Sequence, residues 1–415
     1  MYQIPRGTRD FLPEQAERFR RLEEIAVALA CQYGYGELRT PIFEHSELFA
    51  RSVGESTDIV EKEMYTFQDR GERSLTLRPE GTAGVVRAFV ENKLYGGSLP
   101  AKYYYFGPMF RYEKPQAGRY RQLWQFGVEL FGSEAPRADV EVIALGWQYF
   151  QELGVKANLV INSIGCRQCR GEYKKALVAY LTGRNICELC SNRLERNPLR
   201  VLDCKEESCQ KELEEAPRIS QYLCPQCQEH FQKVKAGLSD ISIPFTQDER
   251  LVRGLDYYNR TTFEYKTNEL GSQDALGGGG RYDDLVELVG GPAVPAVGLA
   301  LGIDRTELMD PPALKKAPGR RGVWLVTMEP VSDQAIALVH PLRQQGVHLG
   351  YDLAGRSFKA QFKQADRNNC RWTLIIGPDD LAQGQAVLRD MDTGEQRQLA
   401  LESLVEMVSN LEGVK

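Results

Sequence analysis

The chain has 415 residues and a formal net charge of −5 at pH 7, and 42% of its residues are hydrophobic and 26% charged. The length favours two or three domains, and the composition disfavours a disordered or coiled-coil protein. No apolar run approaches the roughly 20 residues that a membrane helix needs, and residues 1–9 lack a signal peptide's apolar segment. We therefore expect a cytoplasmic protein with no membrane partner. The negative charge argues against a surface that is basic throughout, although a local basic cluster can still hold nucleic acid.

Helical and strand-like patterns alternate at the start of the chain. Apolar residues recur at helical spacing from Pro13 to Tyr35, and an extended segment begins at Pro41. The segment Leu75–Thr82 has the pattern of a strand that turns into a helix.

Two aromatic segments, Lys102–Phe106 and Trp124–Phe131, have the composition of strands and flank a polar segment that contains glycine. This order predicts an antiparallel hairpin. The hairpin loop carries a basic cluster that can hold RNA or nucleotide phosphate, and its members are Arg111, Lys114, Arg119 and Arg121. A solvated charged hairpin is the alternative.

Most of the cysteines are clustered. Eight of the ten lie in residues 165–240, which are also rich in glutamate and lysine, so we expect an insertion domain here. They form the pairs Cys166 and Cys169, Cys187 and Cys190, Cys204 and Cys209, and Cys224 and Cys227. Four such pairs can complete two zinc sites of four thiolates each, although the spacing does not say which pairs combine, and one site with free thiols stays open. Cys31 and Cys370 stand alone, and we expect both to be core residues.

The segment Arg253–Glu264 is the most informative in the chain. It packs a cation, a carboxylate and two phenols into six residues of a strand-like pattern, and these groups are costly to bury unless a ligand uses them. We interpret it as part of a binding site. A predicted turn of four glycines, Gly277–Gly280, follows and ends in Arg281-Tyr282-Asp283, and Gly298–Arg305 comes after it.

A basic, proline-rich linker, Pro311–Gly319, separates these segments from the end of the chain. Beyond it, strands and helices alternate, which predicts a small α/β domain with a largely parallel sheet. The expected strands are Val323–Thr327, Val347–Tyr351 and Trp372–Ile376, and the expected helices are Ala335–Leu342 and Phe358–Ala365. Basic residues recur every four positions in the second helix and give it one basic face: Lys359, Lys363 and Arg367.

Together with Phe110-Arg111-Tyr112-Glu113, the segments around Arg253, Gly277 and Arg305 resemble the signature motifs of the histidyl-tRNA synthetases, which are class II aminoacyl-tRNA synthetases. The chain resembles the bacterial type, with a cysteine-rich insertion. The resemblance implies an α+β catalytic domain with a six-stranded antiparallel sheet and flanking helices, a helical insertion that clasps the tRNA acceptor arm, and a C-terminal α/β anticodon-binding domain. The expected bounds are 1–164 and 241–312 for the two catalytic parts, 165–240 for the insertion and 320–415 for the anticodon-binding domain.

Amino-acid activation by ATP needs fixed cations, because charge builds on phosphate oxygens that are already anionic. The resemblance implies that Arg111 binds the α-phosphate and the substrate carboxylate, and that Arg305 holds the γ-phosphate. Arg253 matches the arginine that stands where related synthetases place a metal ion. For any one arginine, a surface salt bridge is the alternative. Further expected ATP contacts are Glu113, Arg119 and Arg121, with Mg²⁺ accompanying ATP, and the expected tRNA contacts are Lys114, Gln116, Lys359, Lys363 and Arg367.

A histidine pocket needs an acceptor for the α-ammonium group and polar partners for both imidazole nitrogens. The resemblance places Glu80, Thr82, Gln125 and Glu129 around the ammonium and carboxylate groups, and Tyr257 and Tyr258 near the imidazole with Tyr282 beside them. Packing on a strand is the alternative for the adjacent tyrosines. Leu123 and Trp124 stand where the family often has Phe-His, which puts only the packing behind the pocket in doubt.

These resemblances imply a histidine–tRNA ligase that forms histidyl-adenylate from L-histidine and ATP and transfers histidine to the 3' end of tRNA(His). The first class motif, around Pro41, forms the dimer interface in relatives, so we expect a homodimer. One alternative is a non-catalytic, histidine-sensing regulatory paralogue that serves ATP phosphoribosyltransferase. Such paralogues usually lack the insertion and the C-terminal domain, which this chain keeps. A synthetase for proline or threonine is a further alternative, which Arg253–Glu264 opposes.

Overall fold

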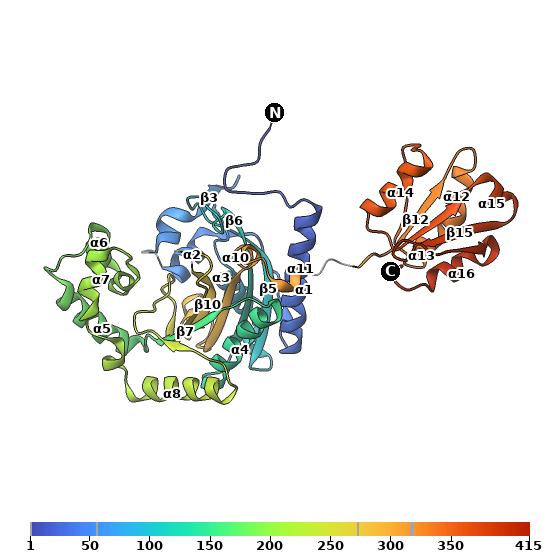
Figure 1. The fold of residues 1–415 in the computed structure, drawn as a ribbon. Coiled ribbons are helices and arrows are strands. Elements are labelled where there is room, and N and C mark those ends of the chain that lie inside the picture. The colour runs from blue at the N-terminus through green and yellow to red at the C-terminus, as the bar shows by residue number, and fades with distance from the viewer. Residues whose placement is uncertain (1, 55–56, 272–273, 316–318) are drawn as a thin grey trace. The chain divides into compact units, whose positions relative to one another are not determined.

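The computed structural model describes residues 2–54, 57–271, 274–315 and 319–415. Contacts divide the chain into a large unit, Met1–Lys315, and a small unit, Lys316–Lys415 (Figure 1). Each unit is described by itself. The first part of the predicted linker forms helix α11 (Pro312–Lys315), and residues 316–318 lie outside the described part of the chain. The finer domain bounds stay predictions.

A central eight-stranded sheet organises the large unit, in the order β1-β5-β6-β11-β10-β9-β7-β8. Its strands are β1 (Gly36–Glu37), β5 (Ala101–Phe110), β6 (Gln122–Phe131), β7 (Asn158–Ser163), β8 (Thr246–Gln247), β9 (Asn259–Lys266), β10 (Ala275–Arg281) and β11 (Ala296–Gly302). The strands from β5 to β7 in this order pair antiparallel, as predicted. The predicted count of six is wrong for the whole sheet, because the two-residue strands β1 and β8 add parallel pairings at its edges.

Two apolar clusters cover the two faces of this sheet. One cluster joins strand residues such as Val128 to helices α1 (Pro13–Gln32), α4 (Pro136–Leu153) and α8 (Pro225–Asp240). The other joins Phe131 to α3 (Thr82–Glu91) and to the segment between α5 and α7. Since side chains alternate along a strand, Gln125 and Glu129 of β6 share the second face with Phe131.

The predicted cysteine-rich insertion consists of short helices: α5 (Arg167–Leu181), α6 (Glu188–Arg196), η3 (Pro198–Asp203), α7 (Glu207–Glu214) and η4 (Ile219–Tyr222), followed by α8. Helices α5, α6 and α7 lie to one side of the central sheet in Figure 1, in green, whereas α8 packs against α4. The remaining short helices of the large unit are α2 (Ser46–Val53), η1 (Ile59–Glu63), η2 (Leu94–Gly96), α9 (Leu285–Leu288) and α10 (Ile303–Leu308).

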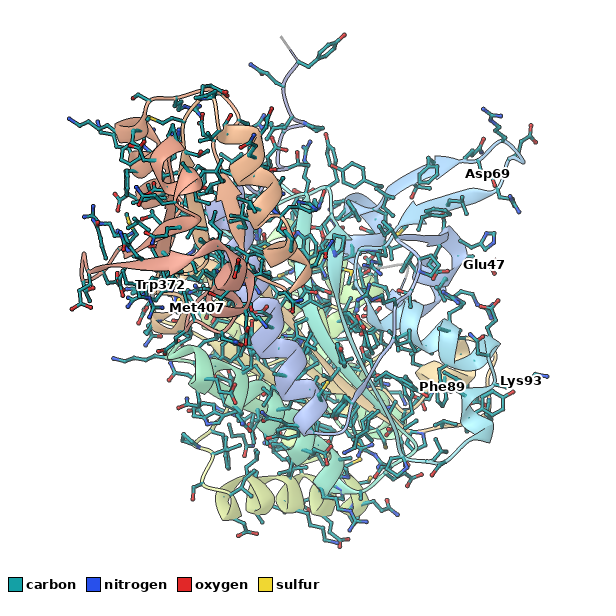
Figure 2. All side chains as sticks on the ribbon, turned by 90° about the vertical axis from the view of Figure 1, so that its right-hand side faces the viewer. Glu47, Asp69, Phe89, Lys93, Trp372 and Met407 are labelled. Carbon is teal, nitrogen blue, oxygen red and sulfur yellow. The ribbon has the colours of Figure 1, made fainter. Side chains whose placement is uncertain are left out.

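A separate three-stranded sheet has the order β2-β4-β3, with β2 at Phe43–His45, β3 at Tyr65–Gln68 and β4 at Ser74–Leu77. The hairpin of β3 and β4 projects from the body, with Asp69 near its tip (Figure 2). The extended segment predicted after Pro41 is therefore a strand, and the predicted strand-to-helix segment is β4 followed by α3.

Three local predictions are wrong. Gly277–Gly280 are not a turn but lie inside β10, where a Cβ atom on Gly279 would come within 1.9 Å of the Gly298 carbonyl oxygen. Glycine serves here to let neighbouring chains approach the strand. Tyr257 and Tyr258 precede β9 instead of lying on it. Cys31 is exposed on α1 rather than buried, because it falls outside the apolar stripe of that helix, whereas Cys370 is buried as predicted.

The small unit is a five-stranded sheet in the order β13-β12-β14-β15-β16. Strands β12 (Val323–Thr327) and β14 (Trp372–Ile376) have the predicted bounds and pair parallel with each other, and β13 (Leu349–Tyr351) pairs parallel with β12. Strands β15 (Gln385–Asp390) and β16 (Gln396–Ala400) add antiparallel pairings, so the sheet is mixed rather than largely parallel.

The helices of the small unit are α12 (Ser332–Val339), α13 (Pro341–Gln344), α14 (Phe358–Arg367), α15 (Pro378–Ala382), η5 (Leu401–Ser403) and α16 (Leu404–Ser409). The predicted helix Ala335–Leu342 is divided at Pro341, because proline starts a helix more readily than it continues one. Across the described ranges of both units, no helix is both long and apolar enough to span a membrane.

Candidate active site

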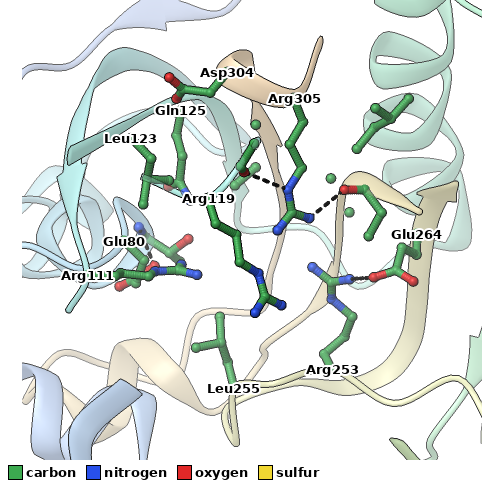
Figure 3. A pocket seen from close by; sticks show the side chains of 18 of the residues that line it. Glu80, Arg111, Arg119, Leu123, Gln125, Arg253, Leu255, Glu264, Asp304 and Arg305 are labelled. Carbon is green, nitrogen blue, oxygen red and sulfur yellow. Dashed lines mark hydrogen bonds and ion pairs between the residues drawn. The ribbon is translucent and has the colours of Figure 1, made fainter. Parts of the chain in front are cut away.

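Four guanidinium groups from distant parts of the large unit converge on one pocket. Arg111 follows β5, Arg119 lies in the β5–β6 loop, Arg253 precedes β9, and Arg305 lies in α10. Figure 3 shows their side chains pointing toward the same space. The pocket lies over the face of the sheet that carries Gln125.

Backbone carbonyl groups hold two of these arginines in place. Arg111 donates from Nε to the Pro79 carbonyl at 2.8 Å, and Arg305 donates from Nη1 to the Ala275 carbonyl at 2.7 Å. Neither contact cancels the charge of its guanidinium group. Burial lowers the pKa of Arg305, and the nearby positive charge of Arg119 lowers it further. The site therefore holds cations that repel one another, which an anionic ligand would relieve.

Carboxylates partner the other two arginines. Arg253 donates from Nη1 to Glu264 at 2.6 Å, and Arg119 lies 3.2 Å from Glu113. Both glutamates line the pocket. Within the described chain the Nε atom of Arg253 is buried and has no hydrogen-bond partner.

The other end of the pocket is a hydrogen-bonded carboxylate network. The Glu80 carboxylate accepts from the backbone N–H groups of Thr82 and Ala83, both at 2.8 Å, at the start of α3. The Thr82 hydroxyl donates to Glu129 at 2.7 Å, and the Tyr282 hydroxyl donates to the other oxygen of Glu129. Glu80 and Thr82 line the pocket, and Glu129 and Tyr282 lie behind them.

Burial raises the pKa of Glu129 to about 8, although the hydrogen bonds from Tyr282 and Thr82 act in the opposite direction. Burial also raises the pKa of Glu80. Two carboxyl groups in a closed site favour a cation there, because a nearby positive charge stabilises their ionised forms. The Oε1 atom of Gln125, which lines the same end, is buried and has no hydrogen-bond partner in the described chain.

Adjacent tyrosines form one wall of the pocket. The ring centroids of Tyr257 and Tyr258 are 4.6 Å apart, and those of Tyr257 and Tyr282 are 5.6 Å apart. A Cβ atom on Gly280 would come within 2.9 Å of the Tyr258 ring, and one on Gly278 within 2.9 Å of Arg253 Nη1. The glycines of β10 therefore make room for the functional side chains that cross it.

The departure from the family pattern at Leu123 and Trp124 divides between two faces of β6. Leu123 lines the pocket, and Trp124 packs on the opposite face against Phe11, Phe19 and Phe106. The change at Trp124 affects the packing behind the pocket, as predicted. The prediction that only this packing is in doubt is wrong for Leu123, because that side chain lines the pocket itself.

Several predicted contacts lie outside this pocket. The Arg121 guanidinium group lies 3.9 Å from the centroid of the Tyr112 ring, and Lys114 and Gln116 are exposed in the β5–β6 loop. In the small unit, the basic face of α14 is exposed: Lys359, Lys363 and Arg367. Sequence reasoning missed Leu255, Glu264 and Asp304, which also line the pocket. All three fall inside the quoted motifs, Leu255 and Glu264 in Arg253–Glu264 and Asp304 in Gly298–Arg305, and that was the available signal.

The clustered cysteines form two groups of four. Cys166 and Cys169 join Cys224 and Cys227, and Cys187 and Cys190 join Cys204 and Cys209. In each group the sulfur atoms lie within 4.8 Å of one another. A backbone N–H donates to a sulfur in each group, from Cys224 to Cys169 at 3.1 Å and from Cys187 to Cys209 at 3.2 Å. The structure thus supplies the pairing that the spacing left open.

The antiparallel sheet core with arginines over one face, joined in sequence to a smaller α/β unit, has the architecture of a class II aminoacyl-tRNA synthetase. A family model described as histidyl-tRNA synthetase matches residues 7–306, and one described as anticodon binding domain matches residues 322–411. The chain belongs to the histidyl-tRNA synthetase family.

Relatives of similar length support this placement. The chain is 51% identical over 407 residues to a histidine–tRNA ligase from Desulforamulus reducens, which covers 97% of both chains. It is 48% identical over 416 residues to a histidine–tRNA ligase from Bacillus velezensis, with 98% of both chains covered. The crystal structure of apo histidyl-tRNA synthetase from S. aureus has 40% sequence identity and a TM-score of 0.84, covering 99% of this chain and all of that one. These matches confirm the predicted histidine–tRNA ligase over the regulatory alternative.

Proposed function

We propose that the pocket binds L-histidine and ATP side by side, forms histidyl-adenylate and transfers histidine to the 3' end of tRNA(His). The observation that carries this proposal is the convergence of Arg111, Arg119 and Arg305 on one cavity beside a carboxylate-lined end. Fixed cations stabilise the charge that develops when a carboxylate attacks a phosphate. The carboxylate network suits the α-ammonium group of an amino acid, and the tyrosine wall suits its imidazole.

Arg253 is the residue best suited to act at the α-phosphate. Its Glu264 partner fixes one end of the guanidinium group at 2.6 Å, and the side chain lines the pocket beside Arg111 and Arg119. An arginine stays charged and donates hydrogen bonds in a planar fork. It can therefore stabilise the charge of the α-phosphate at the position where related enzymes place a metal ion.

The test is pyrophosphate exchange measured with single amino acids. Exchange that depends on histidine supports the proposal, and exchange that depends on proline or threonine would assign the pocket to another amino acid. A folded preparation that exchanges with none of them would support the regulatory alternative.

We propose Mg²⁺ as the ion that accompanies ATP. Mg²⁺ in nucleotide sites is usually held by one or two carboxylates and by the substrate phosphates. Glu113, which lines the pocket beside Arg119, has the oxygen ligands that such an ion needs. The ion would neutralise part of the triphosphate charge. Exchange should stop in EDTA and return when Mg²⁺ is added in excess.

We propose a structural zinc ion in each cysteine group. Zinc–sulfur bonds of about 2.3 Å place tetrahedral ligands about 3.8 Å apart, and the Cys187 and Cys204 sulfurs are 3.8 Å apart. The N–H donors to Cys169 and Cys209 suit thiolates rather than thiols. Metal analysis should find about two zinc ions per chain, and a metal-free preparation with normal stability would refute the assignment.

We propose that tRNA contacts both units. In the large unit, Lys114 and Gln116 are exposed beside the phosphate end of the pocket, and in the small unit the basic face of α14 suits an RNA backbone. Replacing Lys359, Lys363 and Arg367 by glutamate should weaken aminoacylation much more than exchange, because exchange needs no tRNA. An equal loss in both assays would contradict a role in tRNA binding.

We propose a homodimer formed through the three-stranded sheet. Ile42, Phe43 and Phe67 are 44%, 51% and 44% exposed there, and the Phe43 and Phe67 rings are 6.5 Å apart. Light scattering should give twice the chain mass, and Phe43→Glu should shift it toward the monomer. The cytoplasmic location stays a prediction.

A further inference from the structure

The loop that carries the two pocket tyrosines, Arg253–Tyr258, contacts the cysteine-rich insertion at several points. Arg170 in α5 donates from Nη1 to the Tyr258 carbonyl oxygen at 2.6 Å. Just beyond the loop, the backbone of Arg260 exchanges two hydrogen bonds with Ile164 and Gly165, both at 2.8 Å. The C-terminal end of the loop is thus fixed to the start of the insertion.

A second contact holds the middle of the loop. Asn197, which follows α6 and is only 6% exposed, donates from Nδ2 to the Asp256 carboxylate at 2.5 Å. The Asp256 backbone N–H donates to the Val53 carbonyl at 3.1 Å, so the insertion and α2 hold this residue together. Arg200 lies close to the same loop, 3.1 Å from the position that a Cβ atom on Gly254 would take.

Ion pairs fix this part of the insertion to the catalytic body. Arg193 and Arg200 lie 3.3 Å and 3.0 Å from the Asp58 carboxylate, and Arg196 lies 2.8 Å from Glu61. The apolar packing is also continuous, because one cluster of buried side chains contains Leu199 and Val201 of the insertion together with Tyr257 and Tyr258 of the pocket. The insertion therefore does not have a core of its own that is separate from the pocket.

Each cysteine group supports one of the two contacts. Arg170 directly follows Cys169, and Asn197 directly follows α6, the helix that carries Cys190. The side chains that hold the loop are thus presented by the two parts of the chain that the cysteine groups organise.

We infer that Arg170 and Asn197 are positioning residues for the histidine pocket, which act by holding the loop Arg253–Tyr258 so that its tyrosines face the bound imidazole. The inference rests on the proposed binding of histidine beside Tyr257 and Tyr258. It gives the insertion a role in amino-acid binding that does not require tRNA. The tyrosine side of the pocket depends on these contacts, whereas Arg111, Arg119 and Arg305 of the ATP side follow β5 or lie in the β5–β6 loop and in α10. Arg253, at the start of the loop, is held separately by Glu264 of β9 at 2.6 Å.

The first test replaces Arg170 by alanine. The Km for histidine in pyrophosphate exchange, and the Kd for histidine from calorimetry, should rise about tenfold, because a charge-assisted hydrogen bond to the loop is lost. The Km for ATP should stay within about twofold, since Arg170 does not touch the arginine end of the pocket. Arg170→Lys keeps a donor and should recover part of the affinity. Arg167→Ala, an exposed arginine one turn earlier in the same helix, is the matched control.

The second test exchanges the partners of the other contact. Asn197→Asp places two carboxylates together and should raise the Km for histidine about tenfold, and adding Asp256→Asn should restore it, because the hydrogen bond then runs in the opposite direction. Asn192→Asp, the same change at an exposed position of α6, is the control. A merely structural role would not produce this recovery at unchanged Tm.

The outcomes separate this inference from the proposed function. Wild-type protein without histidine-dependent exchange would overturn both. Wild-type exchange together with an unchanged histidine Km in Arg170→Ala and Asn197→Asp would overturn the inference alone. The inference would also be overturned if the single variants changed the Km for ATP, the Km for histidine and the Tm together and the exchanged pair showed no recovery.

Discussion

The two ends of the pocket differ in charge: arginine side chains gather at the phosphate end, and carboxyl groups gather at the amino-acid end. At the phosphate end, Arg111 and Arg305 each donate to a backbone carbonyl group, and burial with the charge of Arg119 lowers the pKa of Arg305. At the amino-acid end, Glu129 has hydrogen bonds to both of its oxygens from Thr82 and Tyr282. The arginines of the first end repel one another. At the second end the Glu80 and Glu129 carboxylates are satisfied by hydrogen bonds, and Gln125 keeps a buried oxygen atom without a partner in the described chain.

This difference indicates what each end contributes. Cations that repel one another are stabilised strongly by a bound anion. The phosphate end can therefore use its positive charge to stabilise a transition state. A satisfied network gains little from a ligand that does not match it, so the amino-acid end is suited to selection by shape and hydrogen bonding. We therefore expect substitutions at the phosphate end to lower the rate, and those at the amino-acid end to change affinity and pH dependence.

The largest effect is expected for Arg253→Ala. Removing one preorganised donor at a reacting phosphate should lower kcat for pyrophosphate exchange by about 10²–10³-fold or more, and it leaves Glu264 without the partner that lies 2.6 Å away. The far-ultraviolet circular dichroism spectrum should be unchanged. Steady-state exchange kinetics at saturating histidine and ATP measure the effect.

Arg137→Ala is the control for this experiment, because Arg137 is an exposed arginine of α4 outside the pocket. Near-normal exchange by Arg253→Ala would show that Arg253 takes no part in the reaction. It would also contradict the expectation that substitutions at the phosphate end lower the rate.

A smaller effect, with a distinct pH signature, is expected for Glu129→Gln. The carboxyl group of Glu129 has a pKa of about 8 in the folded chain, against a reference value of 4.5. Between these values the folded state holds a proton that the unfolded state has lost, so the free energy of unfolding falls as pH rises from about 4.5 to about 8. Glutamine cannot titrate, so the variant escapes this loss. The Tm of Glu129→Gln minus the Tm of wild type should therefore be larger at pH 8.5 than at pH 6, by at least about 2 °C.

Thermal melts without histidine at the two pH values measure this difference. The same variant should also raise the Km for histidine about tenfold, because it removes a charge that the ammonium group stabilises. Parallel Tm values at both pH values would show that Glu129 is not held protonated without histidine, and would contradict the raised pKa of this carboxyl group.

Tyr282→Phe tests the same hydrogen-bonded network around Glu129, and we expect a smaller effect. The Tyr282 hydroxyl donates to Glu129 and opposes the rise in the pKa of that carboxyl group. Its loss should cost about 1 kcal/mol of stability and raise the Km for histidine only a few-fold, with kcat unchanged. If kcat falls instead, the network takes part in the reaction and the two ends are not separate in function.

The charges of the phosphate end are easier to predict from the sequence than the hydrogen bonds of the amino-acid end. Arg111, Arg253 and Arg305 each lie in a recognisable motif, and a charged side chain in such a segment is informative on its own. The partners at the other end depend on contacts between distant segments: Tyr282 and Glu129 are 153 positions apart. No local pattern encodes that bond, just as the cysteine spacing did not encode which pairs combine.

Local patterns also failed where tertiary packing overrode them. The four glycines of β10 have the composition of a turn, but the requirement there is for space, since Arg253 and Tyr258 cross the strand where side chains would otherwise lie. The short strands β1 and β8 each have two residues, too few for any periodicity to predict them. Strands β12 and β14, which are rich in β-branched and aromatic residues and have glycine at one end, Gly322 before β12 and Gly377 after β14, were predicted to the residue.

The smallest effect on activity is expected for Trp124→Phe, which tests whether the departure from the family pattern concerns the pocket. Trp124 points away from it and packs against Phe11, Phe19 and Phe106, with centroid distances of 6.3, 6.3 and 5.8 Å. The smaller ring should lower stability by about 1 to 3 kcal/mol through the cavity that it leaves. The Km for histidine should stay within about twofold of wild type, because Leu123 and Gln125 on the other face of β6 are undisturbed. A Km change as large as that of Glu129→Gln would mean that packing behind the sheet determines the shape of the amino-acid end, which would then be less rigid than its hydrogen bonds indicate.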